Sequence, residues 1–188
     1  YDEQKLEVIL AQMVSLLKGG EPYKMSKRAG NFILMSDVVS EVGSDALRFV
    51  FLSKKSDTHL EFDVDVFKQE DSNNPIFYIN YAHARINQIF AKAGKTLSDV
   101  QDIKLENLSE EAQNLLFSAL LLPEVLEDTF SSRQVQKLTE YLKSLAASLH
   151  KFYNENRVVG SSEESKYLKL FAVVGLSLRV GLKLIGIN

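Results

Sequence analysis

Cysteine is absent from the 188-residue chain, which excludes disulfide bonds and metal sites built on thiolates. The three histidines, His59, His83 and His150, are too scattered for a zinc motif, so we assign no metal ligand. No apolar run approaches the roughly 18 to 20 residues of a membrane span, and the first residues lack the basic start of a signal peptide. With 45% hydrophobic residues, the composition predicts a globular, cytoplasmic protein without a membrane partner.

The net charge of −3 hides a separation of charges along the chain. Eight carboxylates and one lysine lie between Asp99 and Asp128, whereas Ser72 to Ser98 contains no acid. No acid follows Glu164 either, although four basic residues do. Acid-free helices beside an acidic stretch are compatible with a basic face for phosphates, and equally with two helices of complementary charge that pack together.

The tetrapeptide KMSK, residues 24–27, follows a loop that begins Gly19-Gly20-Glu21-Pro22. Two lysines three positions apart on such a glycine- and proline-containing loop can place two ammonium groups on one polyphosphate. Negative charge builds on this polyphosphate as a phosphoanhydride bond breaks. The alternative is a solvated basic turn without a ligand. The tetrapeptide by itself does not decide between them.

Apolar runs, capping residues and breakers predict one strand followed by helices. Ser36 and Ser44 fit as helix N-caps with an acid behind each, and Gly43 fits as the stop between two short helices. Asn74-Pro75 predicts the start of a long helix that stops at Gly94. The expected elements are a buried strand over Val8–Leu17 and helices over 37–42, 45–52, 75–94, 109–122, 123–130, 132–156 and 163–185.

The helix over 75–94 has two distinct faces when its residues are placed about 100° apart. The core face holds Ile76, Ile79, Ala82, Ile86, Phe90 and Ala93. A second stripe holds Tyr78, Tyr81, Arg85, Gln88 and Lys92, with no carboxylate. Aromatic rings and a guanidinium suit unstacked RNA bases, and cations suit RNA phosphates. The same stripe also fits a surface on which one or two tyrosines lie against a neighbouring helix.

The last two helices carry the strongest apolar patterns. In the helix over 132–156, Val135, Leu138, Leu142, Leu145, Ala146 and Leu149 form a core face that Tyr153 and, less closely, Arg157 continue. Tyr153 fits either a core position or a binding position at the helix end. The helix over 163–185 is apolar nearly all round, so we expect it in the middle of the bundle.

Four segments together resemble the bacterial arginyl-tRNA synthetases, which are class I aminoacyl-tRNA synthetases. They are GEPYKMSKRAGNF (20–32), SDALRFVFL (44–52), NPIFYINYAHARI (74–86) and the closing GLKLIGI (181–187). The resemblance implies a mainly α fold: a helical anticodon-binding bundle preceded by a short strand and loop from the nucleotide-binding catalytic domain. We expect residues 1–57 to belong to the catalytic domain and residues 58–188 to the anticodon-binding domain.

For the loop, the resemblance implies that the whole enzyme uses ATP with Mg²⁺ and L-arginine to form an aminoacyl-adenylate. Lys24 and Lys27 would then be catalytic and stabilise the leaving pyrophosphate, while Met25 and Ser26 would shape the loop around ATP. Arg28 stands where the general pattern has serine, so no hydroxyl role is expected there. The chain has no His-Ile-Gly-His-type signature, so these residues alone are expected to bind no cofactor and to be inactive.

For RNA, the resemblance implies that the bundle reads the anticodon loop of arginine tRNA. Tyr81, Arg85 and Tyr153 match base-contacting positions, and Arg157 matches a position where relatives can carry an aromatic residue. Tyr78, Gln88 and Lys92 are expected on the same surface from the stripe alone. We expect a monomer. The alternatives are a helical protein-interaction module without RNA and the equivalent region of a cysteinyl-tRNA synthetase, although Tyr81-Ala82-His83-Ala84-Arg85 favours the arginyl enzyme.

Overall fold

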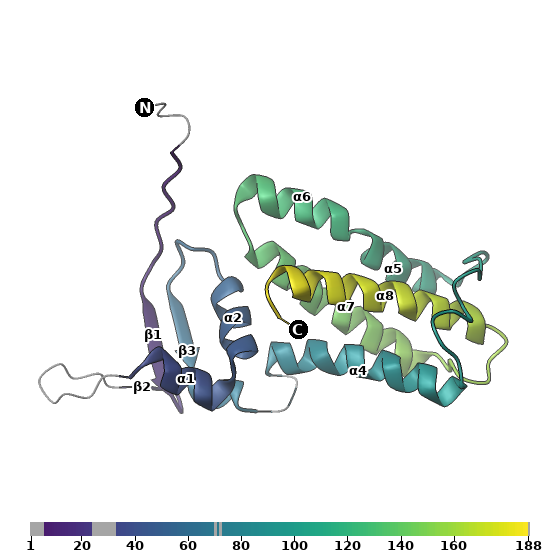
Figure 1. Ribbon diagram of the computed structural model, residues 1–188, viewed down its shortest axis with the longest axis horizontal. Coiled ribbons are helices and arrows are strands. Elements are labelled where there is room, and N and C mark those ends of the chain that lie inside the picture. Colours follow the sequence, from purple (N-terminus) through teal and green to yellow (C-terminus); the bar gives the residue numbers. More distant parts are fainter. Residues whose placement is uncertain (1–5, 24–32, 70, 72, 188) are drawn as a thin grey trace, which may run out of the picture.

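A computed structural model describes residues 6–23, 33–69, 71 and 73–187. A small sheet with three short helices adjoins a bundle of five helices, and the helix α4 enters the bundle beside the sheet unit (Figure 1). The elements are β1 (Val14–Lys18), β2 (Glu21–Pro22), α1 (Met35–Val42), α2 (Ser44–Leu52), β3 (Leu60–Asp63), α3 (Val64–Phe67), α4 (Pro75–Ala93), α5 (Glu110–Leu120), α6 (Leu122–Ser132), α7 (Gln136–Glu155) and α8 (Glu164–Leu184). The predicted mainly α fold is confirmed.

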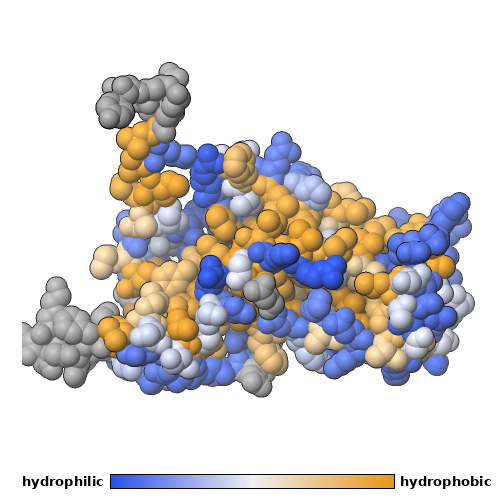
Figure 2. All heavy atoms as spheres, viewed as in Figure 1, coloured by the Kyte–Doolittle hydropathy of each residue, from blue (hydrophilic) through white to orange (hydrophobic). Residues whose placement is uncertain are grey.

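The sheet has the strand order β2-β1-β3, with β1 antiparallel to β2 and parallel to β3. The expected buried strand over Val8–Leu17 is wrong in its extent, because β1 begins only at Val14. Pairing runs from Val14 opposite Leu60 to Leu17 opposite Asp63, so β3 is too short to support a longer β1. The apolar residues before β1 are exposed, including Val8 at 72% and Leu10 at 80% (Figure 2).

The two short helices α1 and α2 form where the sequence predicts them, but their caps differ. Leu34 precedes α1, and the backbone N–H of Leu34 donates a hydrogen bond to the side chain of Asp37 at 3.2 Å. Gly43, at φ +84°, ends α1 and precedes α2, so Ser44 is the first residue of α2. Ser36 and Ser44 are therefore not N-caps, because each lies inside its helix.

The helix α4 has the predicted ends. The Asn74 side chain accepts a hydrogen bond from the N–H of Phe77 at 3.3 Å and donates to the carbonyls of Phe67 and Gln69. Pro75 occupies the first turn, and Gly94 closes the helix in the left-handed region at φ +63°. Five of the six predicted core residues are buried, and Ala93 is half-buried.

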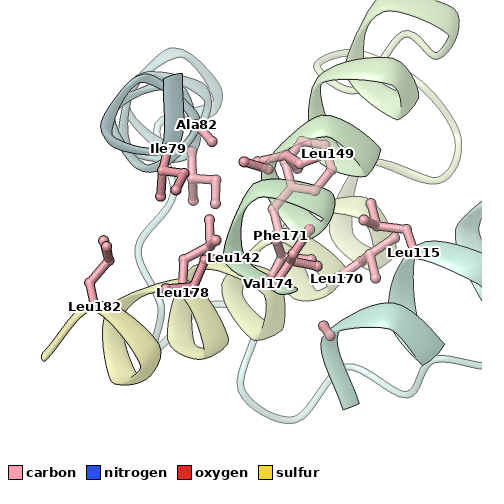
Figure 3. Packing of buried hydrophobic residues seen from close by; sticks show 14 of the residues in the cluster. Ile79, Ala82, Leu115, Leu142, Leu149, Leu170, Phe171, Val174, Leu178 and Leu182 are labelled. Atoms are coloured by element: carbon pink, nitrogen blue, oxygen red, sulfur yellow. The ribbon is translucent and has the colours of Figure 1, made fainter. Parts of the chain in front are cut away.

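Helices α4, α5, α7 and α8 enclose the main core, as Figure 3 shows for Leu142, Phe171 and Leu178. The close approach of α7 and α8 needs a glycine, because a Cβ on Gly181 would lie 2.6 Å from Cδ2 of Leu142. Helix α8 packs against α4, α5 and α7, as its apolar pattern predicts for a helix in the middle of the bundle. One flank stays exposed, with Leu176 at 51% and Leu184 at 60%.

The start of α7 also differs from the prediction. Arg133 adopts a left-handed conformation at φ +57° and ends α6, so Ser132 belongs to α6 and α7 begins at Gln136. Val135 therefore lies before α7 and is 36% exposed instead of packing in the core. None of the described helices combines the length and apolar character that a membrane-crossing segment requires.

The sheet unit has its own small core of Val38, Leu47, Val50, Leu60, Phe62 and Val64. Strand β3 and the start of α3 contribute to this core and not to the bundle. The division at residues 57/58 stays a prediction, and the pairing of β3 with β1 favours a boundary between Phe67 and Asn74.

Candidate nucleic-acid interface

The guanidinium of Arg85 lies between two tyrosine rings from different helices. Its Cζ atom is 4.7 Å from the ring centroid of Tyr81 on α4 and 4.6 Å from that of Tyr153 on α7. Tyr81 and Arg85 share a face of α4 because they are four residues apart, and the packing of α7 against α4 brings Tyr153 to the other side. We call Arg85 with these two tyrosines the arginine clamp.

Hydrogen bonds fix the orientation of the clamp. One terminal nitrogen of Arg85 donates to the hydroxyl of Tyr81 at 3.0 Å, and the other donates to Nδ1 of His150 at 2.9 Å. A guanidinium has no acceptor, so Nδ1 of His150 must be unprotonated. Nε2 of His150 then carries the proton and donates to the backbone carbonyl of Tyr78 at 3.3 Å.

His150 is buried, and this burial lowers its pKa. The hydrogen bond to the Tyr78 carbonyl acts in the opposite direction, while the charge of Arg85 lowers the pKa further. The ring is therefore neutral near pH 7 and can accept the hydrogen bond from Arg85. His150 was missed as a site residue from the sequence, although it precedes Tyr153 by three positions on α7 and so shares a helix face with it.

Aromatic rings extend the clamp along α4. The ring of Tyr81 lies 6.4 Å from that of Phe77 and nearly parallel to it, and 5.4 Å from His150. Tyr78 contacts His150 at 4.5 Å between ring centroids. Tyr81 is 43% exposed, whereas Arg85 and Tyr153 are half-buried. An exposed aromatic ring beside a fixed cation can stack a planar base.

A pocket of about 630 Å³ adjoins the clamp at the end of α4. Lys92, Tyr153, Arg157 and the acid Glu155 are among its lining residues. Nε of Arg157 donates to the carbonyl of Val159 at 3.2 Å, and a Cβ on Gly160 would lie 3.1 Å from Nη2 of Arg157. The structure thus places Lys92 and Arg157 beside Tyr153. Gln88 is exposed on α4 and is not among the residues that line this pocket.

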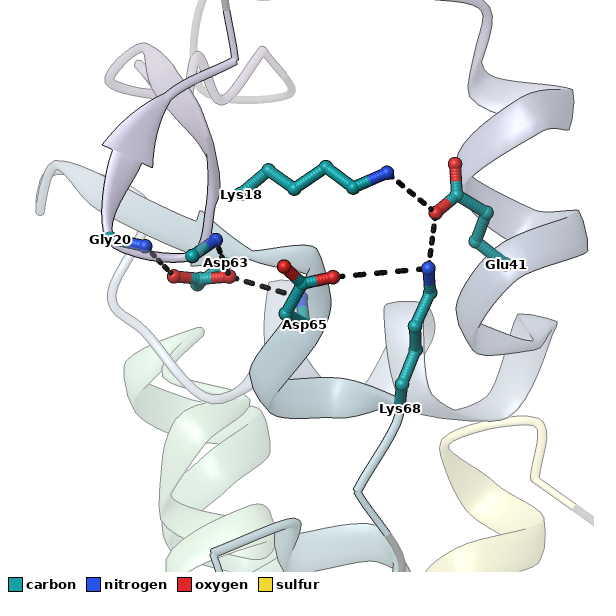
Figure 4. A network of polar contacts seen from close by, with 7 residues as sticks. Lys18, Gly20, Glu41, Asp63, Asp65 and Lys68 are labelled. Atoms are coloured by element: carbon teal, nitrogen blue, oxygen red, sulfur yellow. Dashed lines mark hydrogen bonds and ion pairs between the residues drawn. The ribbon is translucent and has the colours of Figure 1, made fainter.

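Residues 24–27 of the KMSK loop lie outside the described residues, but the chain leading to them is anchored (Figure 4). Asp63 accepts hydrogen bonds from the backbone N–H groups of Gly19 at 3.2 Å and Gly20 at 2.6 Å. Partial burial acts to raise the pKa of Asp63, but these N–H groups and that of Asp65 outweigh it and lower the pKa. Asp63 is therefore a firmly ionised anchor for the β1–β2 turn.

A charge cluster joins the same turn to the neighbouring helices. Glu41 on α1 pairs with Lys68 and, at 3.4 Å, with Lys18 at the end of β1 (Figure 4). The hydrogen bond from Lys68 is the main cause that lowers the pKa of Glu41. Within the described ranges, no three His, Asp or Glu side chains converge as metal ligands.

Two known protein families match parts of this chain. The family described as "DALR anticodon binding domain" matches residues 79–188, which contain the clamp and the adjoining pocket. The chain belongs to this family. Residues 7–64 of this DALR-family chain match a second family, described as class I tRNA synthetases (I, L, M and V).

The whole DALR-family chain is similar to arginine–tRNA ligases. It is 72% identical over 188 residues to the ligase of Campylobacter curvus and 66% identical to that of Nitratiruptor sp.. In both cases the match covers 100% of this chain and 36% of the relative, so the chain spans about a third of the length of these relatives. The predicted resemblance to arginyl-tRNA synthetases is confirmed.

Solved structures agree with this relationship. A Campylobacter jejuni protein assigned as an arginyl-tRNA synthetase has a TM-score of 0.94 and 62% identity, covering 100% of this chain and 41% of that one. The Thermus thermophilus arginyl-tRNA synthetase has a TM-score of 0.70 at 22% identity, covering 92% of this chain and 33% of that one. The second match supports the fold alone.

Proposed function

We propose that this chain reads the anticodon loop of arginine tRNA as part of an arginine–tRNA ligase. The observation that carries the proposal is the arginine clamp, in which the 43% exposed Tyr81 lies beside the fixed guanidinium of Arg85. Sequence-specific RNA recognition uses unstacked loop bases, which stack on aromatic rings and on guanidinium planes. In the clamp the guanidinium lies between two rings, so the exposed part of the Tyr81 ring is the surface for a base and Arg85 supplies positive charge beside it.

Each clamp residue has a separate role in this proposal. Tyr81 stacks one base on the exposed part of its ring, and Tyr153 supports Arg85 from the other side. Arg85 is oriented before RNA arrives, because His150 and the Tyr81 hydroxyl already hold two of its nitrogens. Such preorganisation reduces the entropy that is lost on binding. Tyr78 carries the carbonyl that fixes the His150 tautomer.

The cations beside the clamp suit the RNA backbone. Lys92 and Arg157 line the adjoining pocket with Tyr153, where a phosphate next to a stacked base can lie between them. Gln88, exposed on α4, adds an amide that can hydrogen-bond to a base edge or a ribose hydroxyl. Phosphate contacts position the RNA, and the clamp with Gln88 supplies the discrimination between bases.

In the same proposal the ligase joins arginine to its tRNA at the expense of ATP. Lys24 and Lys27 stabilise the charge that develops on pyrophosphate as the arginine carboxylate attacks the α-phosphate, and Met25 and Ser26 shape the loop around ATP. Mg²⁺ would accompany ATP, and we assign no described residue to it. These 188 residues by themselves are expected to be inactive. We propose a monomeric, cytoplasmic enzyme.

A gel-shift comparison of arginine tRNA with an anticodon-substituted version tests the RNA proposal. We expect the 188-residue chain to prefer arginine tRNA. Tyr81→Ala should weaken that complex by about 5- to 150-fold, which corresponds to the roughly 1–3 kcal/mol of one base–aromatic stack. Phe117→Ala, which removes an aromatic ring that is 64% exposed on α5, is the matched control and should bind normally.

Lys24→Ala is a second control, because the loop lysine has no role in anticodon binding under this proposal. Equal binding of the two RNAs by the wild-type chain, together with no effect of Tyr81→Ala, would show that the clamp does not read bases. Equal losses for Tyr81→Ala and Phe117→Ala would point to general destabilisation instead.

A further inference from the structure

A second groove, lined by the apolar Ala84, Leu182 and Ile187 as well as by polar side chains, lies on the other flank of α4, between this helix and the C-terminal part of α8. Its volume is about 540 Å³. Asn80, His83 and Asn87 line it from α4, and Arg179 and Lys183 line it from α8. Figure 2 shows strongly hydrophilic atoms over α8 near its C-terminal end, bordered by hydrophobic ones.

The polar side chains of this groove differ from those of the clamp in their contacts. Within the described part of the chain, none of the five makes a side-chain hydrogen bond or an ion pair, whereas Arg85 makes two hydrogen bonds. No carboxylate is among the lining residues. Two uncompensated cations beside two amides form an anion-binding surface, because cations and amide N–H groups all donate to oxygen.

The groove and the clamp lie on opposite flanks of one helix. At about 100° per residue, Asn80, His83 and Asn87 project to one side of the buried face of α4, and Tyr81 and Arg85 project to the other. Ala84 and Gln88 lie between the two flanks and are exposed, so the surface is continuous across α4. A helix with its side chains is only about 10–12 Å wide, a short distance for a nucleic-acid strand to cross.

We propose that this groove binds backbone phosphates of the same RNA whose bases the clamp reads, an inference that rests on the proposed function. Arg179 presents a planar fork that matches phosphate oxygens, and Lys183 adds a point charge one turn away on α8. Asn80 and Asn87 donate their amide hydrogens to the same oxygens. The groove contributes affinity that does not depend on base identity, and the clamp contributes the discrimination.

Salt dependence of tRNA binding tests this assignment. In the 188-residue chain, the double variant Arg179→Gln/Lys183→Gln removes both cations and keeps polar side chains of similar length. Each phosphate contact contributes about 0.7 to the slope of log K against log salt for single strands, so the slope should fall by about 1.4. Affinity at 0.1 M salt should then fall about 10- to 30-fold, equally for arginine tRNA and its anticodon-substituted version.

A second double variant, Lys104→Gln/Lys151→Gln, removes the same charge elsewhere and is the matched control. Lys104 is a loop residue with an 83% exposed side chain, and Lys151 lies on the α7 side that faces α5. This control should keep the wild-type slope. Thermal unfolding should show that both double variants are folded, since all four residues are exposed.

The possible outcomes separate this inference from the proposed function. If the wild-type chain prefers arginine tRNA but the Arg179/Lys183 variant keeps the full slope, the groove does not bind phosphate and the clamp proposal stands. Equal loss of slope in the control variant would also overturn the inference, since net charge alone would explain it. Loss of discrimination in the Arg179/Lys183 variant would show that the groove reads bases. A wild-type chain that binds neither RNA would overturn both.

Discussion

Replacing Arg85 with lysine separates the charge of the clamp from its geometry. Arg85→Lys keeps the positive charge, but one ammonium cannot span the hydroxyl of Tyr81 and Nδ1 of His150 while it lies between two rings. The variant therefore loses at least one hydrogen bond and much of the stacking. Buried His150 also loses the donor that its Nδ1 faces in the wild-type chain.

The size of the effect follows from these contacts. A hydrogen bond to a charged group contributes about 1.5–3 kcal/mol and a cation–π contact about 0.5–1 kcal/mol at exposed sites. Lysine recovers part of both, and Arg85 is half-buried, so water can reach the site. We expect a net loss of about 1–2 kcal/mol in the free energy of unfolding. For a chain of this size, that loss lowers the melting temperature by roughly 2–8 °C.

Two measurements check this prediction. Urea unfolding gives the loss of stability, and gel shifts at several salt concentrations give the affinity for arginine tRNA. Affinity should also fall, by up to the roughly 5- to 150-fold that one base–aromatic stack is worth, because Tyr81 loses the partner that orients it, while the salt slope stays the same because the charge is kept. Arg48→Lys makes the same change on an exposed side chain of α2 that belongs to neither the clamp nor the groove, and it should alter neither quantity appreciably.

One result would refute the reasoning. If Arg85→Lys had wild-type stability and wild-type affinity, Arg85 would act only as a positive charge, and the two rings and His150 would not be needed to orient it. A loss of stability without a loss of affinity would make the clamp a packing feature of α4 and α7, not an RNA-binding one.

Two further changes test the clamp and the bundle. Because the pKa of His150 is lowered in the folded chain, its stability contribution is complete above the ordinary value near 6.5 and declines as pH falls towards the folded value. Urea unfolding from pH 7.5 to 5 should therefore show a steeper loss for the wild-type chain than for His150→Gln, and parallel curves would contradict the neutral histidine. Gly181→Ala places a methyl group 2.6 Å from Leu142 and should cost about 1–3 kcal/mol. Gly181→Ala combined with Leu142→Ala should recover part of this loss, and a Gly181→Ala chain as stable as the wild type would mean that α7 and α8 have room to separate.

Local signals in the sequence predicted the parts of the fold that depend on neighbouring residues. Asn74, Pro75 and Gly94 define α4 because capping, a fixed φ angle and a left-handed stop act within a few residues. The spacing of four residues also placed Tyr81 and Arg85 together on one face. By contrast, the length of β1 depends on β3, and Arg133 ends α6 without any glycine or asparagine to signal it.

Which residues form the clamp depends on contacts between helices, and the periodicity of the sequence does not reveal these contacts. Arg85 was expected to be an open cation, but the packing of α7 against α4 places it between two rings and bonds it to His150. Nothing local to His150 marks it as a partner of a residue 65 positions away in sequence. The phosphate groove proposed between α4 and α8 likewise exists only because Arg179 and Lys183 approach the second flank of α4.

The amino-acid sequence by itself determined the helices, their buried faces and the family, since these follow from helical period, caps and short motifs. The tertiary structure alone decided which side chains meet: Tyr153 and His150 at Arg85, and Asp63 at the Gly19-Gly20 turn. The physical reason is that hydrogen bonds and stacking act over a few ångströms, so they form between residues that folding brings together from distant parts of the chain.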